Sequence, residues 1–136
     1  MPPERLLLDS SVWIASRTLG ERFHSPALEI VLDTARPAAV LDLTLYEIAN
    51  AVGARRGDLH MLARIFRSVE QRCFESVVRA DPVLVEMVAG IAVEHGLTAY
   101  DAAYVGVARR YEWQLVSTDI RDLVSKGLAI TPDAAV

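Results

Sequence analysis

The sequence predicts an α/β fold in which helices cover a parallel β-sheet. Short and almost continuously apolar runs alternate along the chain with longer segments of helical periodicity. Strands without alternating polar residues are typical of parallel sheets, which are buried on both faces. The chain has 136 residues, 52% of them hydrophobic, and shows no repeat or linker. We therefore expect a single domain spanning residues 1–136.

The first elements are a strand and two helices. Leu6 to Leu8 form an apolar run that ends in Asp9-Ser10-Ser11, residues that cap helices, so a short helix is expected through Val12 to Ala15. Ser25-Pro26 has the form of a cap followed by proline in the first helical turn. This pair predicts a helix that runs to about Thr34.

A second strand and two further helices are expected next. The strand spans Ala38 to Leu43, and Thr44-Leu45-Tyr46-Glu47 then has the Thr-x-x-Glu form of a capping box. The helix that this box opens is expected to end at Gly53 or Gly57. Another amphipathic helix is predicted from Asp58.

The middle of the chain predicts a strand and two more helices. Phe74 to Val78 is rich in residues that favour strands. Asp81-Pro82 predicts the start of a helix that ends near His95-Gly96. Thr98 to Asp101 repeats the capping-box form and opens a helix to Tyr111.

The last elements complete a sheet of about five strands. Gln114 to Ser117 is a strand, Thr118-Asp119 opens a helix to about Lys126-Gly127, and Leu128 to Ile130 is a final short strand. Two predicted helices precede each of the strands 74–78 and 114–117, so simple alternation does not place those helices.

Composition excludes several classes of protein. No segment approaches 18 uninterrupted apolar residues, and Met1 to Arg5 carries an acid and two prolines instead of a secretion signal, so we expect a cytoplasmic protein without a membrane span. The single cysteine, Cys73, excludes an internal disulfide and a cysteine-based zinc site. The net charge of −4 has the wrong sign for binding nucleic acid by bulk electrostatics alone. Bound cations would reverse this field locally.

Four acids are expected to meet at one edge of the sheet. Asp9 and Asp119 follow strands, and Glu47 lies in the first turn after the strand 38–43. The carboxyl ends of parallel strands share one edge. The helix 98–111 must run back to the start of the strand at 114, so its first turn, with Asp101, lies at the same edge.

Each acid also has a purely structural explanation. Asp9 and Asp119 have the position of helix caps, and Glu47 and Asp101 have the third position of a capping box. Asp122 fits a first-turn acid that faces solvent and is held in reserve. Convergence favours a shared role, because independent caps have no reason to meet.

A carboxylate cluster without cationic neighbours favours a divalent ion. Two carboxylates about 4 Å apart repel by on the order of 4 kcal/mol at an effective dielectric near 20. Mg²⁺ or Mn²⁺ prefers oxygen ligands and keeps several waters, and such ions assist phosphodiester hydrolysis. Arginines could supply a path for RNA or simply complement helix dipoles. Trp13 and Tyr46 are candidates for stacking on bases, with ordinary packing as the alternative.

The chain resembles the PIN-domain ribonucleases, most closely VapC-type toxins. The resemblance rests on four segments in order, which are Leu7 to Ala15, Leu45 to Val52, Leu97 to Ala108, and Leu115 to Asp119. It covers nearly the whole chain. Ser117 and Thr118 match the serine or threonine that usually stands beside the fourth acid.

The resemblance implies a three-layer α/β/α fold and Mg²⁺- or Mn²⁺-dependent cleavage of single-stranded or loop RNA. Asp9, Asp101 and Asp119 would be metal ligands, and Glu47 would bind the metal directly or through water and help to orient the nucleophile. It also implies a homodimer and an inhibitory antitoxin partner.

Other classes fit the sequence less well. A haloacid-dehalogenase-like phosphatase needs Asp-x-Asp, but Ser11 stands at the second position. A receiver-type signalling domain needs paired early acids and a late lysine at a strand end, and this sequence has neither. Dinucleotide binding needs a Gly-x-Gly-x-x-Gly loop after the first strand, which is also missing. A catalytically silent PIN-like module that binds RNA or an antitoxin remains the alternative to an enzyme.

Overall fold

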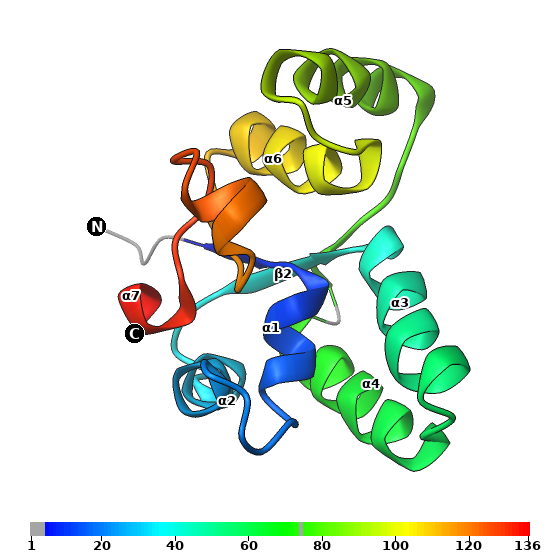
Figure 1. The fold of residues 1–136 in the computed structure, drawn as a ribbon, viewed down its shortest axis with the longest axis vertical. Coiled ribbons are helices and arrows are strands. Elements are labelled where there is room, and N and C mark those ends of the chain that lie inside the picture. Colours follow the sequence, from blue (N-terminus) through cyan, green and yellow to red (C-terminus); the bar gives the residue numbers. More distant parts are fainter. Residues whose placement is uncertain (1–4, 74) are drawn as a thin grey trace.

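A parallel sheet lies at the centre of the molecule. The computed structural model describes residues 5–73 and 75–136, and within these the sheet has four parallel strands in the order β3-β2-β1-β4. Helices cover both of its faces (Figure 1). The strands are β1 (Leu6–Leu8), β2 (Ala38–Leu41), β3 (Val77–Val78) and β4 (Gln114–Val116). The three-layer α/β/α prediction is confirmed, with four strands in place of about five.

The expected final strand is reduced to one bridge. Ile130 pairs with Val116 in a parallel bridge outside the named strands. Pro132 then begins the short helix α7 (Pro132–Ala135), which was not predicted. Proline lacks the N–H that would continue a strand ladder, so pairing stops here.

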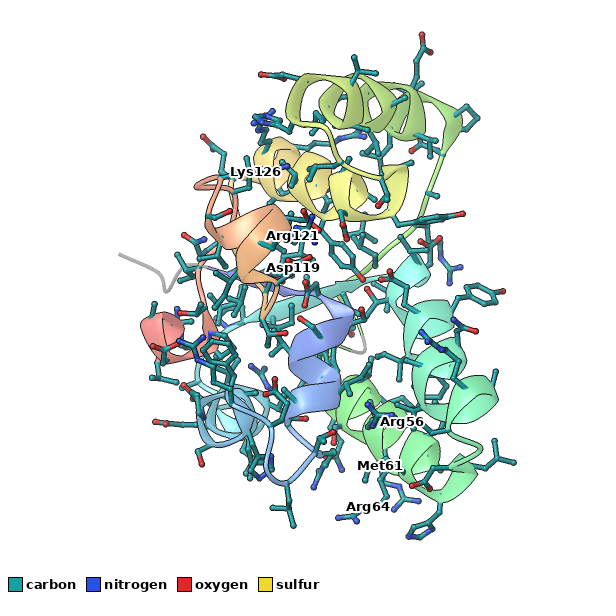
Figure 2. All side chains as sticks on the ribbon, viewed as in Figure 1. Arg56, Met61, Arg64, Asp119, Arg121 and Lys126 are labelled. Carbon is teal, nitrogen blue, oxygen red and sulfur yellow. The ribbon has the colours of Figure 1, made fainter. Side chains whose placement is uncertain are left out.

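Side chains of β1 divide between two cores. Leu6 and Leu8 pack with α1 (Ser10–Ala15), α2 (His24–Leu32) and α4 (Leu59–Cys73). Leu7 points to the other side, where α5 (Pro82–His95) and α6 (Ala99–Tyr111) cover the sheet. Figure 2 shows side chains filling the spaces on both sides. Burial on both faces explains why the strands are continuously apolar.

Two predicted helix starts in the first half are wrong. Ser25 was expected to cap a helix that begins at Pro26, but helix α2 begins at His24, and its cap residue, Phe23, makes no side-chain capping bond. Here Glu21 accepts a bond from the Phe23 amide, at 2.7 Å, and the His24 ring contacts the Ala15 carbonyl, at 2.8 Å. These contacts with the preceding segment fix the start of the helix in place of a serine cap.

The capping box predicted at Thr44 is also wrong. Strand β2 ends at Leu41, and helix α3 (Asp42–Ile48) begins at Asp42. The Asp42 carboxylate accepts bonds from the Leu43 amide, at 2.8 Å, and from the distant Ala80 amide, at 3.0 Å. Glu47 therefore lies in the second turn of α3, where it caps nothing.

The remaining helices follow the predictions more closely. Asp58 accepts a bond from the Met61 amide at the start of α4, Asp81 caps α5, and Thr98 caps α6. Helix α3 continues into a π-helical segment, η1 (Ala49–Arg55). The helix expected after Asp119 is a short π-helical segment, η2 (Ile120–Val124). Of the strand expected at 74–78, Phe74 lies outside the described residues.

Within the described residues, no single helix is long and apolar enough to cross a membrane. Helices α5 and α6 together meet the length and composition of a span, but they are bent by 110° at the break between them.

Candidate metal centre

The carboxyl edge of the sheet carries the predicted acids. Asp9 follows β1, and Asp119 comes three residues after β4. Helix α3, with Glu47, leaves the end of β2. Asp101 lies in the first turn of α6, which runs back toward the start of β4. The parallel topology therefore places all four at one rim, as the sequence predicted.

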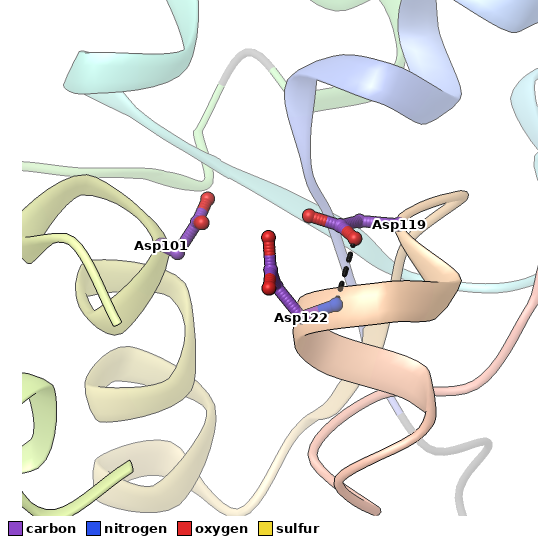
Figure 3. A group of neighbouring side chains, drawn as sticks. All are labelled: Asp101, Asp119 and Asp122. Carbon is purple, nitrogen blue, oxygen red and sulfur yellow. Dashed lines mark hydrogen bonds between the residues drawn. The ribbon is translucent and has the colours of Figure 1, made fainter. Parts of the chain in front are cut away.

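Three carboxylates at this rim face a common space. One oxygen from each of Asp101, Asp119 and Asp122 lies within 4.8 Å of the others, and all three residues are half-buried. Figure 3 shows Asp101 on α6, Asp122 on η2 and Asp119 just before η2, with their carboxylates turned toward a common space. The Asp119 carboxylate caps η2 by accepting a bond from the Asp122 amide, at 3.0 Å. Asp122, expected to face solvent, instead joins the group.

Asp9 is the most buried of the acids, with 6% of its surface exposed. Its Oδ1 accepts bonds from the Ser11 amide, at 3.1 Å, and the Val12 amide, at 3.3 Å, and from the Ser11 hydroxyl. Burial raises the pKa of Asp9 to about 6, against the hydroxyls of Ser11 and Ser117, which favour the charged form. The Ser117 hydroxyl also accepts a bond from the Asp119 amide, at 3.0 Å. This serine therefore joins Asp9 to the segment that carries Asp119.

Glu47 lies beside hydroxyl groups of two other helices. The Tyr104 hydroxyl donates to Glu47 Oε1 from α6, and the Ser10 hydroxyl of α1 lies close enough to the same carboxylate to favour its charged form. Burial raises the pKa of Glu47, these two hydroxyls lower it, and the charge of Asp101 raises it again. Because Glu47 lies in the second turn of α3, its side chain cannot cap the start of that helix. Contacts from another helix hold the carboxylate in place instead.

The acids repel one another and lack cationic partners. Burial raises the pKa of Asp101, and the charges of Asp119 and Asp122 raise it further. Within residues 5–73 and 75–136, the ion pairs join Glu94 to His95 and Arg109, and none involves a rim acid. The charge of Lys126 lowers the pKa of Asp101 in turn. Lys126 and Arg121 belong to the same short segment as Asp119 (Figure 2).

This donor set suits a hard divalent ion. All the converging atoms are carboxylate oxygens, and their mutual repulsion is relieved by a cation that they share. Mg²⁺ and Mn²⁺ prefer such ligands. Asp101, Asp119 and Asp122 would hold the ion. Asp9 and Glu47, which the sequence also predicted for the site, lie at the same rim and are not part of this group of three, although the charge of Asp101 acts on Glu47 and that of Glu47 on Asp9.

Trp13 does not have the position proposed for base stacking. Its side chain is fully buried in the core below β1. Tyr46, by contrast, is 77% exposed, one residue before Glu47. Trp13 therefore packs in the core, and of the two aromatic residues only Tyr46 has a side chain that an RNA base could reach.

A family model for the PIN domain matches residues 6–125. The chain belongs to the PIN-domain family. Ribonuclease VapC3 of Pyrobaculum aerophilum is 32% identical to this PIN domain over 140 residues, which cover 94% of this chain and 99% of the relative. Exonuclease VapC9 of the same organism is 40% identical over 90 residues, or 65% of each chain.

Solved structures share the fold of this PIN domain. The PAE2754 protein of Pyrobaculum aerophilum has a TM-score of 0.71 and 29% identity, covering 97% of this chain and 86% of that one. VapC20 of Mycobacterium tuberculosis, a toxin that cleaves the sarcin–ricin loop, has a TM-score of 0.73 at 18% identity, with 90% and 95% covered. A toxin–antitoxin complex from Klebsiella pneumoniae has a TM-score of 0.69 at 21% identity, with 93% and 97% covered. The last two similarities concern the fold alone.

Proposed function

We propose that this PIN domain is a Mg²⁺- or Mn²⁺-dependent endoribonuclease, the toxin of a VapBC-type toxin–antitoxin pair, which cuts single-stranded or loop RNA in the cytoplasm. The observation that carries the proposal is the convergence of Asp101, Asp119 and Asp122, whose oxygens lie within 4.8 Å of one another without a cationic partner among the described residues. The near end-to-end match to Ribonuclease VapC3 supports the RNA substrate.

The proposed roles follow from geometry and charge. Asp101, Asp119 and Asp122 would hold the ion, and Asp9, which the family resemblance implies as a further ligand, would complete the set. When bound, the ion supplies Lewis acidity at the phosphate and lowers the pKa of a water ligand. Glu47 orients the attacking water and accepts its proton.

The chain itself supports the role of Glu47. Burial and Asp101 raise the pKa of its carboxyl group, which moves it toward the range that suits a general base near neutral pH. The Tyr104 hydroxyl occupies one acceptor site of Glu47 Oε1 and orients the carboxylate, and the Ser10 hydroxyl favours its charged form.

We further propose a homodimer and a cognate antitoxin. The unpaired acids would attract a basic antitoxin segment, which would compete with the ion for the carboxylates. The Klebsiella pneumoniae structure, a toxin–antitoxin complex with the same fold, is consistent with such a partner.

Incubation of the purified protein with labelled RNA and Mn²⁺, beside the Asp9→Asn variant, tests the activity. The proposal expects metal-dependent cleavage that EDTA stops and that the variant lacks. Equal RNA binding by both proteins without cleavage by either would favour the silent binding module. Sedimentation of the same sample measures the oligomeric state.

The similarity to Exonuclease VapC9 gives a second candidate, cleavage from an RNA end. A circular RNA of the same sequence separates the two modes, because it has no end. Endonuclease action linearises the circle, whereas an exonuclease leaves it intact and degrades only the linear form.

A further inference from the structure

A chain of buried hydrogen bonds ends on Glu47. The Leu41 amide bonds Thr44 Oγ1, at 3.2 Å, Thr44 Oγ1 bonds the Tyr104 hydroxyl, at 2.8 Å, and the Tyr104 hydroxyl bonds Glu47 Oε1. Thr44 is 0% and Tyr104 is 2% exposed. The hydrogen-bond chain thus joins the end of β2 to α3 and α6 through two buried bonds and ends on the half-buried carboxylate of Glu47.

Chemistry fixes the direction of each bond. A backbone amide can only donate, so Thr44 Oγ1 accepts from Leu41. The Thr44 hydroxyl hydrogen is then free for the Tyr104 oxygen, and the Tyr104 hydrogen is free for the carboxylate of Glu47. Both hydroxyl groups in this series of hydrogen bonds therefore donate one bond and accept another. The Tyr104 hydroxyl, the last donor, points at Glu47, an acid of the candidate metal centre.

Tyr104 also relates Glu47 to the other side of the rim. It lies three residues after Asp101 on α6, a spacing that places both on one face of the helix. Glu47 comes from the second turn of α3, beyond the bond between the Leu41 amide and Thr44 Oγ1 at the start of the helix. A donor from α6 therefore sets the position of Glu47 relative to Asp101.

We propose that Tyr104 is a positioning residue whose hydroxyl, oriented by Thr44, holds the Glu47 carboxylate at the candidate metal centre. The role in turnover rests on the proposed nuclease function. The positioning itself is a property of the fold and is measurable without any metal or RNA.

The hydroxyl is removed in Tyr104→Phe, and Tyr111→Phe removes the exposed hydroxyl at the other end of the same helix as a matched control. In metal-free protein, the side-chain carboxyl ¹³C signal of Glu47, assigned by its loss in Glu47→Gln, is expected to shift in Tyr104→Phe and to stay unchanged in Tyr111→Phe.

The kinetic test measures cleavage of a labelled single-stranded RNA with Mn²⁺. In Tyr104→Phe, kcat is expected to fall on the order of ten- to a hundredfold, with KM changed less than threefold. In a Glu47→Gln background, Tyr104→Phe is expected to cause little further loss.

Thr44 supplies a second test with its own rescue. Thr44→Ser keeps the hydroxyl and is expected to retain the Glu47 signal and the rate. Thr44→Val removes the hydroxyl and is expected to shift the signal and lower kcat. Circular dichroism at the assay temperature confirms that each variant is folded.

An unchanged Glu47 signal in both Tyr104→Phe and Thr44→Val would overturn the positioning role, whether or not the protein cuts RNA. A shifted signal with full kcat would overturn the part in turnover. Absence of cleavage by the wild-type protein would instead overturn the nuclease function and leave the hydrogen-bond chain standing.

Discussion

The backbone amide of Thr118 donates a hydrogen bond of 3.0 Å to Ser11 Oγ, although the two residues are 107 positions apart. The same Ser11 hydroxyl donates to Asp9 Oδ1. One serine therefore ties the acid after β1 to the segment that leads into Asp119. This link fixes the distance between two of the proposed metal ligands.

Ser11→Ala is expected to loosen this link. The Thr118 amide loses its partner, which costs about 1 kcal/mol in the free energy of unfolding. Asp9 loses a donor, and cleavage of RNA is expected to fall on the order of tenfold. Denaturant unfolding and single-turnover cleavage measure the two effects. Ser25→Ala, at an exposed position in α2, is the control. A full rate in Ser11→Ala would remove the serine from the positioning of Asp9.

The buried carboxyl of Asp9 makes metal-free stability depend on pH. Its pKa is raised from the ordinary 3.8 to about 6 in the folded protein, so the folded state holds its proton more strongly than the unfolded state does. The contribution of this group to the free energy of unfolding is fully present below about pH 4. It falls by roughly 3 kcal/mol as the pH rises through about 6. In Asp9→Asn, which keeps an acceptor for the amides of α1, this loss is expected to disappear.

Denaturant unfolding in EDTA from pH 4 to 8 checks this prediction. Above pH 6 the inactive variant is expected to be more stable than the wild-type protein. Added Mn²⁺ is expected to reverse that order, because the ion stabilises only the folded state with the acid present. Parallel pH profiles of the two proteins would contradict the raised pKa of Asp9.

Asp122→Asn tests the fifth acid. Its carboxylate shares the space of Asp101 and Asp119, so its loss is expected to weaken Mn²⁺ binding about tenfold and to lower the rate at limiting Mn²⁺. Titration calorimetry measures the affinity. Asp133→Asn, at an exposed acid in the first turn of α7, is the control. Equal affinity in both variants would return Asp122 to the role of a first-turn acid.

The convergence of the acids was predictable because it follows from topology alone. Parallel strands must end at one edge, and α6 must run back to reach β4, so Asp9, Asp101 and Asp119 share one rim whatever the details of packing. Of these three, Asp101 and Asp119 come within 4.8 Å of each other, together with Asp122. The caps Asp81 and Thr98 were predictable for a local reason, since each bonds an amide three residues away.

Features set by remote contacts were not predictable. Helix α3 begins at Asp42 with Leu41 as its cap residue, and the Asp42 carboxylate is held by the Ala80 amide, 38 residues away. Thr44, expected as the cap, instead accepts a bond from the Leu41 amide in the third helical position. Asp122 looks like any solvent-facing acid of a first turn, because its neighbour Asp101 comes from another helix. The bond from Tyr104 to Glu47 spans 57 residues and has no local signal.

The contact between α5 and α6 gives a prediction that separates packing from helix propensity. A Cβ added at Gly106 of α6 would lie 2.9 Å from Val88 Cγ2 and 3.3 Å from Met87 Cε. Val88 is short and buried and cannot swing away, so Gly106→Ala is expected to lower the free energy of unfolding by about 1–3 kcal/mol, although alanine favours helix more than glycine does.

At Gly90 of α5 nothing lies within 4 Å of the added atom. Gly90→Ala is therefore expected to stabilise by roughly 1 kcal/mol. Because α6 carries Asp101 and Tyr104, Gly106→Ala is also expected to slow cleavage, whereas Gly90→Ala leaves the rate unchanged. Denaturant unfolding of the pair gives opposite signs if α6 packs this closely, and stabilisation by both changes would show that the two helices lie further apart.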